Sequence, residues 1–178
     1  IIIEENTRTS AEPVADESYS ITTENGNIVI RANGYLGTMW GIYTLSEKFL
    51  DVDPCYLFND LAIVKKDAVE LSEVDIADKP DGFGFRGVFI NDEDLLQGWK
   101  DGGGARLVGG GYYYVTVAKT VIKKVVETVL RLKLNLVIPA TFIDLDNPPE
   151  KDLADAVAER GIYLSQHHCE PLGVSSFT

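Results

Sequence analysis

Short apolar runs alternate with polar connections over the first eighty residues. The opening IIIEEN and the two halves of YSITTENGNIVIRA are rich in β-branched residues and have strand length. The turn sequence Glu24-Asn25-Gly26 separates the two halves, and Asn-Gly between such runs is a strong hairpin signal. A further short strand is predicted in DAVEL, residues 67–71. This pattern predicts a small sheet.

A helix is predicted directly after the hairpin, in NGYLGTMWGIYTLSEKFL. Asn33-Gly34 marks its start, and its apolar residues recur at helical spacing. These are Leu36, Trp40, Tyr43, Leu45 and Phe49. Aromatic side chains at such spacing belong more often to a core than to a sugar-stacking platform, and we extend this expectation to Tyr56 and Phe58. Residues 1–78 are therefore predicted to form an α+β domain with one helix packed on a sheet.

The pattern changes after IADKPDGF, residues 76–83, which has the composition of a linker. The apolar runs FRGVFI, LVIPATF and IYLSQ alternate with helical patterns in TVAKTVIKKVVETVLRLKLN and EKDLADAVAERG. Continuous apolar strands that alternate with helices are typical of parallel βα units. Residues 79–178 therefore predict an α/β domain. The glycine-rich DGGGARLVGGG fits no phosphate-loop motif and is predicted to be a surface loop.

The number of βα units limits the architecture. Three parallel strands do not close a barrel, and a (β/α)₈ barrel typically takes about 250 residues. Far fewer residues follow the linker in this chain of 178. We therefore expect the first three βα units of a truncated TIM barrel.

Composition excludes some function classes. The formal net charge of -12 repels phosphate backbones and argues against nucleic-acid binding. No apolar run reaches the length of a membrane-spanning helix, so we expect no membrane partner. Cys55 and Cys169 are too few for a disulfide framework and suit a reduced compartment. The chain shows no export signal, and both an exported and a cytoplasmic location stay open.

Candidate chemistry collects after the predicted strands, where parallel α/β folds place their sites. Asn91-Asp92-Glu93-Asp94 follows the first strand and His167-His168-Cys169-Glu170 follows the third. Parallel strands would bring these carboxylates, imidazoles and amides to one face, where they suit acid–base chemistry on sugars. Arg86, earlier in its strand, could bind a carboxylate bidentately. A solvated turn that caps the strand is the alternative for residues 91–94.

A metal site in this segment is disfavoured. Adjacent residues of an extended strand point to opposite faces, so His167 and His168 do not converge easily on one ion. The chain contains no HExxH and no CxxC, and its histidines and cysteines fit no familiar zinc spacing. The same alternation argues against a Cys-His nucleophilic pair at 168 and 169. We expect neither a metal nor another cofactor.

Four segments resemble the xylan α-1,2-glucuronidases of glycoside hydrolase family 115. They are NIVIRANGYLGTMWGIYTLSEKFLDVDPCYLFND, FRGVFINDED, RLKLNLVIPATF and LADAVAERGIYLSQHHCEP, which are similar to the family's GIYxLSE, RGxFINDE, LRLKxNxxxPA and SHHEP motifs. The resemblance runs from about residue 17 to the end. It implies an inverting hydrolase that removes (4-O-methyl)glucuronic acid from xylan at a TIM-barrel pocket, preceded by a hexosaminidase-like domain, without a metal or redox cofactor.

The resemblance also implies site residues. Asp92, Glu93 and Glu170 become candidates for catalysis, while Arg86, Asn91, His167 and His168 become candidates for substrate binding. Three departures affect this pocket: Thr141-Phe142 replaces a family Met-Trp, Cys169 is inserted before Glu170, and DGGGARLVGGGYYYVT replaces a segment like FGGFN. The principal acid and base of the family are expected beyond residue 178.

Three functions follow from these patterns. The first is an N-terminal fragment of a glucuronidase, inactive alone because a third of a barrel cannot exclude water. The second is a non-catalytic carbohydrate-binding or interaction module. The third is a relative of family 67 α-glucuronidases or β-hexosaminidases, which the sequence at 91–94 disfavours. In the first two cases the partner is a carbohydrate, and an exposed sheet edge would favour self-association.

Overall fold

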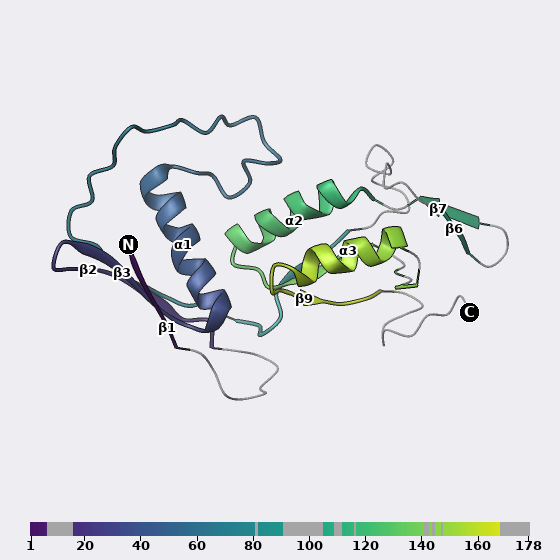
Figure 1. Ribbon diagram of the computed structural model, residues 1–178, viewed down its shortest axis with the longest axis horizontal. Helices are drawn as coiled ribbons and strands as arrows, with labels where there is room; N and C mark the ends of the chain where they lie inside the picture. Colours follow the sequence, from purple (N-terminus) through teal and green to yellow (C-terminus); the bar gives the residue numbers. More distant parts are fainter. Residues whose placement is uncertain are drawn as a thin grey trace. The chain divides into compact units, whose positions relative to one another are not determined.

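In the computed structural model, the chain divides into two compact units. The described residues are 1–6, 16–80, 82–90, 105–108, 112–115, 117–140, 143, 145–146 and 148–167. Unit 1 contains Ile1–Phe85 together with Leu130–Leu134, and unit 2 contains Arg86–Val129 and Asn135–Thr178. Figure 1 labels the helices of both units and the strands β1–β3, β6, β7 and β9. The predicted domains, 1–78 and 79–178, stay a prediction.

Unit 1 contains a four-stranded sheet in the order β1-β3-β2-β4. The hairpin is confirmed, because β2 and β3 pair antiparallel around Asn25 and Gly26, whose φ angles of 49° and 75° suit a tight turn. β1 pairs parallel with β3, and β4 pairs antiparallel with β2. The strands are β1 (Ile2–Asn6), β2 (Tyr19–Glu24), β3 (Asn27–Asn33) and β4 (Asp75–Asp78).

The last strand of this sheet was placed wrongly by the sequence pattern. Residues 67–71 form no strand, and the strand β4 begins instead at Asp75 and extends into the segment 76–83 that was predicted as a linker. Its sequence, DIAD, has one large apolar residue, so its pattern is weak. Pairing with β2 specifies the strand: the backbone N–H of Thr23 donates to Val74 O at 2.9 Å, and Tyr19 Oη donates to Asp78 at 3.0 Å.

Helix α1 (Gly34–Leu50) packs on this sheet, as predicted. Figure 1 shows the helix lying over the sheet, and Trp40 of this helix is fully buried. Gly41 permits the close approach, since a Cβ at this position would lie 2.6 Å from Ile30 Cγ2. Among the aromatic side chains expected in the core, Tyr43 is buried, but Phe58 is 43% exposed, so the expectation was wrong for Phe58.

A polar network ties the segment 130–134 into unit 1. Tyr19 Oη lies 2.7 Å from Thr44 Oγ1 and donates to Asp78, and the Lys133 ammonium donates to the same carboxylate. Lys133 Nζ also lies 5.3 Å from the centre of the Tyr19 ring. Arg131 contributes through a hydrogen bond of 3.2 Å to Ser46 Oγ. Although burial alone would raise the pKa of Asp78, hydrogen bonds and charge from Lys133 outweigh it and lower that pKa.

Removal of this network should give a pH-dependent loss of stability. We expect Asp78→Asn to lower the free energy of unfolding by about 1 kcal/mol at pH 7. A carboxyl whose pKa is lowered by folding stabilises above its unfolded pKa, near about 4, and loses this effect as the pH falls through its folded pKa. The difference from wild type in urea unfolding should therefore shrink from pH 6 to pH 3. Asp75→Asn, on the same strand, is the control, and an equal loss in both variants would contradict the network's role.

Unit 2 contains the predicted parallel βα pattern. Its three strands run parallel in the order β5-β8-β9, and two helices lie side by side, joined by Lys119–Asp152 and Arg160–Glu127 contacts of 3.2 and 2.9 Å. Gly161, with φ of 66°, lies in the turn after the second helix, where its N–H donates to Ala158 O at 3.0 Å. The elements are β5 (Gly87–Phe89), α2 (Lys119–Arg131), β8 (Leu136–Ile138), α3 (Pro148–Ala158) and β9 (Tyr163–Leu164). The α/β class is thus established, and the truncated barrel stays a prediction.

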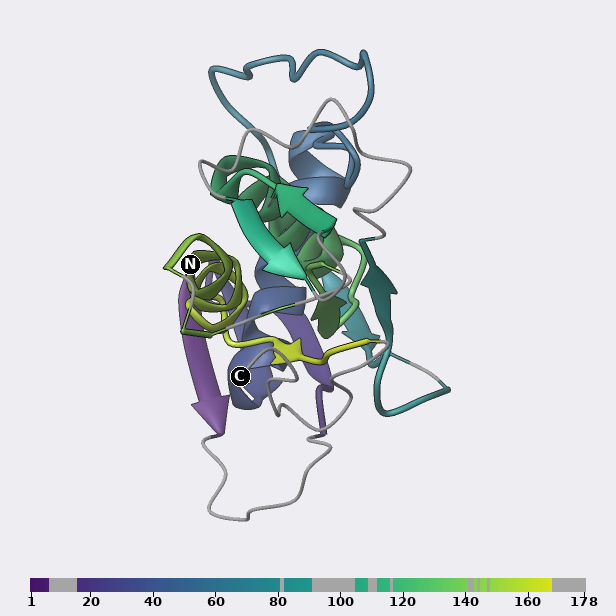
Figure 2. The ribbon, with the colours of Figure 1, turned by 90° about the vertical axis from the view of Figure 1, so that its right-hand side faces the viewer.

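The glycine-rich segment contains more structure than a loop. Strands β6 (Ala105–Val108) and β7 (Tyr112–Val115) pair antiparallel, with Ala105 opposite Val115. Figure 2 shows them as a separate two-stranded ribbon. The flanking glycines concealed these short strands in the sequence, since glycine clusters ordinarily mark loops. The hairpin belongs to the connection between β5 and α2.

Candidate functional site

The carboxyl ends of β5, β8 and β9 lie at one edge of the parallel sheet. The ladder continues to this edge, where Ile90 N donates to Ile138 O at 2.9 Å and Ser165 N donates to Val137 O at 3.2 Å. The first two βα connections leave from the same edge, which is where parallel α/β folds build their sites. This edge is therefore the candidate site.

The first and third strand ends meet through two rings. The centroids of Phe89 and His167 lie 4.4 Å apart with an interplanar angle of 27°, which is a stacked pair. His167 is exposed, while Phe89 is partly buried. Stacking on a ring restricts the imidazole to a narrow range of orientations. Phe89, which the sequence interpretation did not single out, thus orients a predicted substrate-binding side chain.

Gln166 holds the end of β9 from the other side. Its Nε2 donates to Ile143 O at 3.2 Å, and its Oε1 is buried without a hydrogen-bond partner in the described part of the chain. Because successive side chains of an extended segment alternate, anchoring Gln166 on one face directs His167 to the opposite face. Gln166 is a positioning residue for His167.

Arg86 lies at the opposite end of its strand. It precedes β5, and its backbone N–H donates to Asn135 Oδ1 at 2.8 Å, while its carbonyl accepts from the N–H of Asn135 at 2.8 Å and of Leu136 at 3.0 Å. These contacts close the amino edge of the sheet. The backbone of Arg86 therefore lies at the amino edge, and the role of its side chain in binding a uronate stays a prediction.

Asn135 holds together the starts of the three parallel strands, a role that the sequence analysis did not predict. It is fully buried, and its carbonyl also accepts from Tyr163 N at 2.7 Å, so one residue joins β5, β8 and β9. Asn135 comes at the end of the helical pattern RLKLN, and nothing in that pattern predicts that it joins three strands. The burial of its amide becomes evident only when β5 and β8 are adjacent.

Truncation of this amide should destabilise unit 2. Asn135→Ala removes a fully buried amide and leaves the Arg86 N–H without its acceptor in a part-buried hydrogen bond, so we expect a loss of about 1–3 kcal/mol in the free energy of unfolding. Urea denaturation followed by circular dichroism measures it. Asn27→Ala removes an exposed amide with one long hydrogen bond of 3.4 Å and serves as the matched control. Equal stability of the two variants would show that the buried amide is dispensable.

The other predicted site residues lie outside the described residues. These are Asn91, Asp92, Glu93, His168 and Glu170. The edge described above is where the chain enters both segments, and the roles of their side chains stay predictions. Within the described ranges, no cluster of three or more His, Cys, Asp or Glu side chains could hold a metal ion. The helices of these ranges are also too short or too polar to cross a bilayer.

Comparison with known proteins gives matches to glycoside hydrolases. The sequence profile of glycosyl hydrolase family 115 matches residues 78–177. The structure is similar to that of BtGH115A, a GH115 4-O-methyl-α-glucuronidase with specificity for decorated arabinogalactans, at 25% identity and a TM-score of 0.71 over 95% of this chain. It is also similar in fold to the Flavobacterium johnsoniae chitobiase FjGH20, at 15% identity and a TM-score of 0.55 over 92% of this chain. The chain spans 24% of the length of each of these proteins. Comparison with curated protein sequences gives no match.

Proposed function

Because the chain belongs to glycosyl hydrolase family 115, we propose that it is part of an enzyme that hydrolytically removes (4-O-methyl)glucuronic acid from a polysaccharide. The observation that carries this proposal is the edge formed by β5, β8 and β9. This edge lies within the residues that the family profile matches, and the Phe89–His167 contact joins two of its strand ends. In the sequence, Asp92, Glu93 and Glu170 follow these strand ends.

The proposed reaction proceeds with inversion. One carboxylic acid protonates the leaving-group oxygen, while a carboxylate about 6.5–9.5 Å away activates a water on the opposite face of the sugar. Asp92, Glu93 and Glu170 are candidates for these roles or for hydroxyl binding. His167 and His168 would bind the uronate carboxylate by charge-assisted hydrogen bonds, and Asn91 would bind sugar hydroxyls. The 178-residue chain alone is proposed to be inactive, because three strands cannot enclose the pocket and exclude water.

Two polysaccharides are candidates for the substrate. Glucuronoxylan follows from the family resemblance of the sequence motifs, and it is our first choice. Decorated arabinogalactan is the second, since the name of BtGH115A states this specificity. Both carry the same terminal sugar in this proposal, and the choice between them depends on contacts to the polysaccharide backbone.

The test measures release of glucuronic acid from both polysaccharides, by this chain and by the full-length product of its parent reading frame. We expect release by the long form only, with xylan preferred. Proton NMR of the first product should show the β-anomer, as inversion at an α-linkage requires. Preference for arabinogalactan would replace the first substrate by the second. Absence of release by either form from either polysaccharide would refute the proposed activity.

A further inference from the structure

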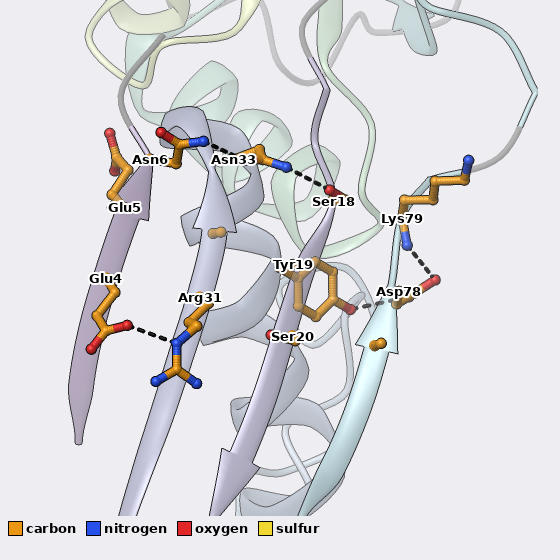
Figure 3. Close-up of a pocket in the computed structure, with 12 residues that line it drawn as sticks. Glu4, Glu5, Asn6, Ser18, Tyr19, Ser20, Arg31, Asn33, Asp78 and Lys79 are labelled. Carbon is orange, nitrogen blue, oxygen red and sulfur yellow. Dashed lines mark hydrogen bonds and ion pairs between the residues drawn. The ribbon is translucent and has the colours of Figure 1, made fainter.

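A groove lies in unit 1, on the sheet face that carries Arg31. It has a volume of about 850 Å³ and is lined by residues of all four strands and their ends. Figure 3 shows these side chains along the upper part of the sheet. Binding sites for small ligands commonly have volumes of about 300–1,000 Å³. The groove is therefore large enough for several sugar units.

The strand register explains the shape of the groove. Glu4, Arg31, Ser20 and Ala77 are consecutive cross-strand neighbours and so form one row on one face. Long side chains stand on β1 and β3, whereas Ser20 and Ala77 are small. The small residues form a floor, and Lys79 lines the groove at the end of β4, with its side chain pointing away from the strands (Figure 3). Sequence alternation alone places this row opposite the α1-covered core face.

The polar groups of the groove are held in place. The Asn6 amide donates to Asn33 Oδ1 at 3.1 Å, and the Asn33 amide donates to Ser18 Oγ and to Asp16, each at 2.9 Å. Arg31 donates to Glu4 at 2.7 Å and forms a two-point ion pair with Glu24. Side chains fixed before binding lose little conformational entropy when a ligand arrives.

The charges of the groove are largely satisfied internally. Hydrogen bonds from Arg31 lower the pKa of Glu24 to about 2, so their ion pair persists over the ordinary pH range. The side chains of Asp78 and Glu5, two other lining residues, alternate to the face covered by α1, where Asp78 accepts from Tyr19 and Lys133 and Glu5 accepts from Thr38 at 2.9 Å. Compensated charges offer little net attraction to an ion, whereas hydroxyl groups can bind beside them as both donors and acceptors. In the described part of the chain, Ser20 Oγ and Lys79 Nζ hold no hydrogen bond and are available to such a ligand.

We infer that this groove binds a neutral stretch of the polysaccharide backbone, as a second carbohydrate site separate in sequence from the strand ends of unit 2. The inference rests on the proposed function for its ligand class. Recognition depends on hydrogen bonds, because the aromatic residue that lines the groove, Tyr19, is only 4% exposed and cannot stack on a sugar ring. Binding should therefore be weak and insensitive to salt, since the ligand is uncharged.

The test is an NMR titration of the isotope-labelled 178-residue chain with xylohexaose. We expect amide shifts in β1–β4, with an affinity that Ala77→Tyr weakens at least about tenfold by filling the floor of the groove. Asp75→Tyr places the same ring two residues away on the same strand, outside the lining residues, and should leave the affinity within about twofold. His167→Ala should also leave it unchanged.

Each contrary outcome has a distinct meaning. Loss of binding in His167→Ala alone would place xylohexaose at the strand ends of unit 2 and overturn the groove site, while the proposed function would stand. Equal affinity of Ala77→Tyr and wild type, or no binding at all, would also overturn it. If Ala77→Tyr instead changes the sedimentation coefficient without a change in sugar affinity, the groove joins copies of the chain and the inference fails. Glucuronic acid release by the full-length product is measured separately, so failure of the groove and of the activity are distinguishable.

Discussion

Gly87→Ala is expected to unfold unit 2 or to leave it only marginally stable. A Cβ at this position would lie 2.2 Å from the carbonyl oxygen of Leu136 and 2.8 Å from its carbonyl carbon. Gly87 and Leu136 are cross-strand partners, so relief of the clash requires the backbones of β5 and β8 to separate. We expect a loss of about 3 kcal/mol or more in the free energy of unfolding. Urea denaturation monitored by circular dichroism measures this loss.

Gly41→Ala provides the comparison for this prediction. Its nearest contact would be a side-chain atom, Ile30 Cγ2 at 2.6 Å, which can move by rotation and small shifts. Alanine also gains about 1 kcal/mol over glycine inside a helix, which offsets part of the strain. We therefore expect a clearly smaller loss than for Gly87→Ala. A Gly87→Ala variant as stable as wild type would mean that β5 and β8 pair less closely than the structure shows.

Replacement of Glu93 or Glu170 by glutamine is expected to cause the largest loss of activity. In the full-length product, a variant that lacks the general acid or base should lose about 10²–10⁴-fold in kcat, because no positioned group transfers the proton. If the carboxylate binds only a sugar hydroxyl, KM should rise while kcat changes little. Glucuronic acid release at several substrate concentrations separates the two roles. Asp92→Asn belongs to the same series.

The control for this series is Glu159→Gln. Glu159 lies just after α3, and among the described residues its carboxylate makes only long contacts to cations, 4.0 Å to Lys119 and 3.8 Å to Lys123. Its replacement should leave kcat and KM unchanged. If Glu93→Gln, Glu170→Gln and Asp92→Asn all behave like this control, none of the three carboxylates acts as the acid or base of this enzyme.

Periodic apolar patterns predicted the long elements well. The stripe through Leu36, Trp40 and Tyr43 predicted α1, and the Asn25-Gly26 turn predicted the hairpin, since both signals depend on local chain geometry. β4 escaped detection because its stability comes from pairing with β2, some fifty residues earlier in the chain. Propensity carries no information on such distant partners.

The candidate site was predictable to a similar extent. Parallel strands share a carboxyl edge, so the meeting of the first and third strand ends, seen in the Phe89–His167 contact, followed from the βα pattern alone. The convergence of residues 91–94 with residues 168–170 stays a prediction. The contacts of Asn135 could not be foreseen, because its burial depends on which strands are neighbours. Arg86 was expected to bind a carboxylate group in the pocket because of its charge. The hydrogen bond of its backbone N–H to Asn135 at the amino edge could not be foreseen from the sequence.

Unit 1 is built from two separate segments of the chain, and this has a consequence for its synthesis on the ribosome. Leu130–Leu134 belong to this unit although they follow residues 86–129 of unit 2 in the chain. Arg131 and Lys133 can reach Ser46 and Asp78 only after they have emerged from the exit tunnel. The nascent sheet and α1 must therefore wait for α2 to be translated before their last contacts form, at a synthesis rate of about 5–20 residues per second. During this interval of seconds, the first domain is exposed to chaperones and proteases in an unfinished state.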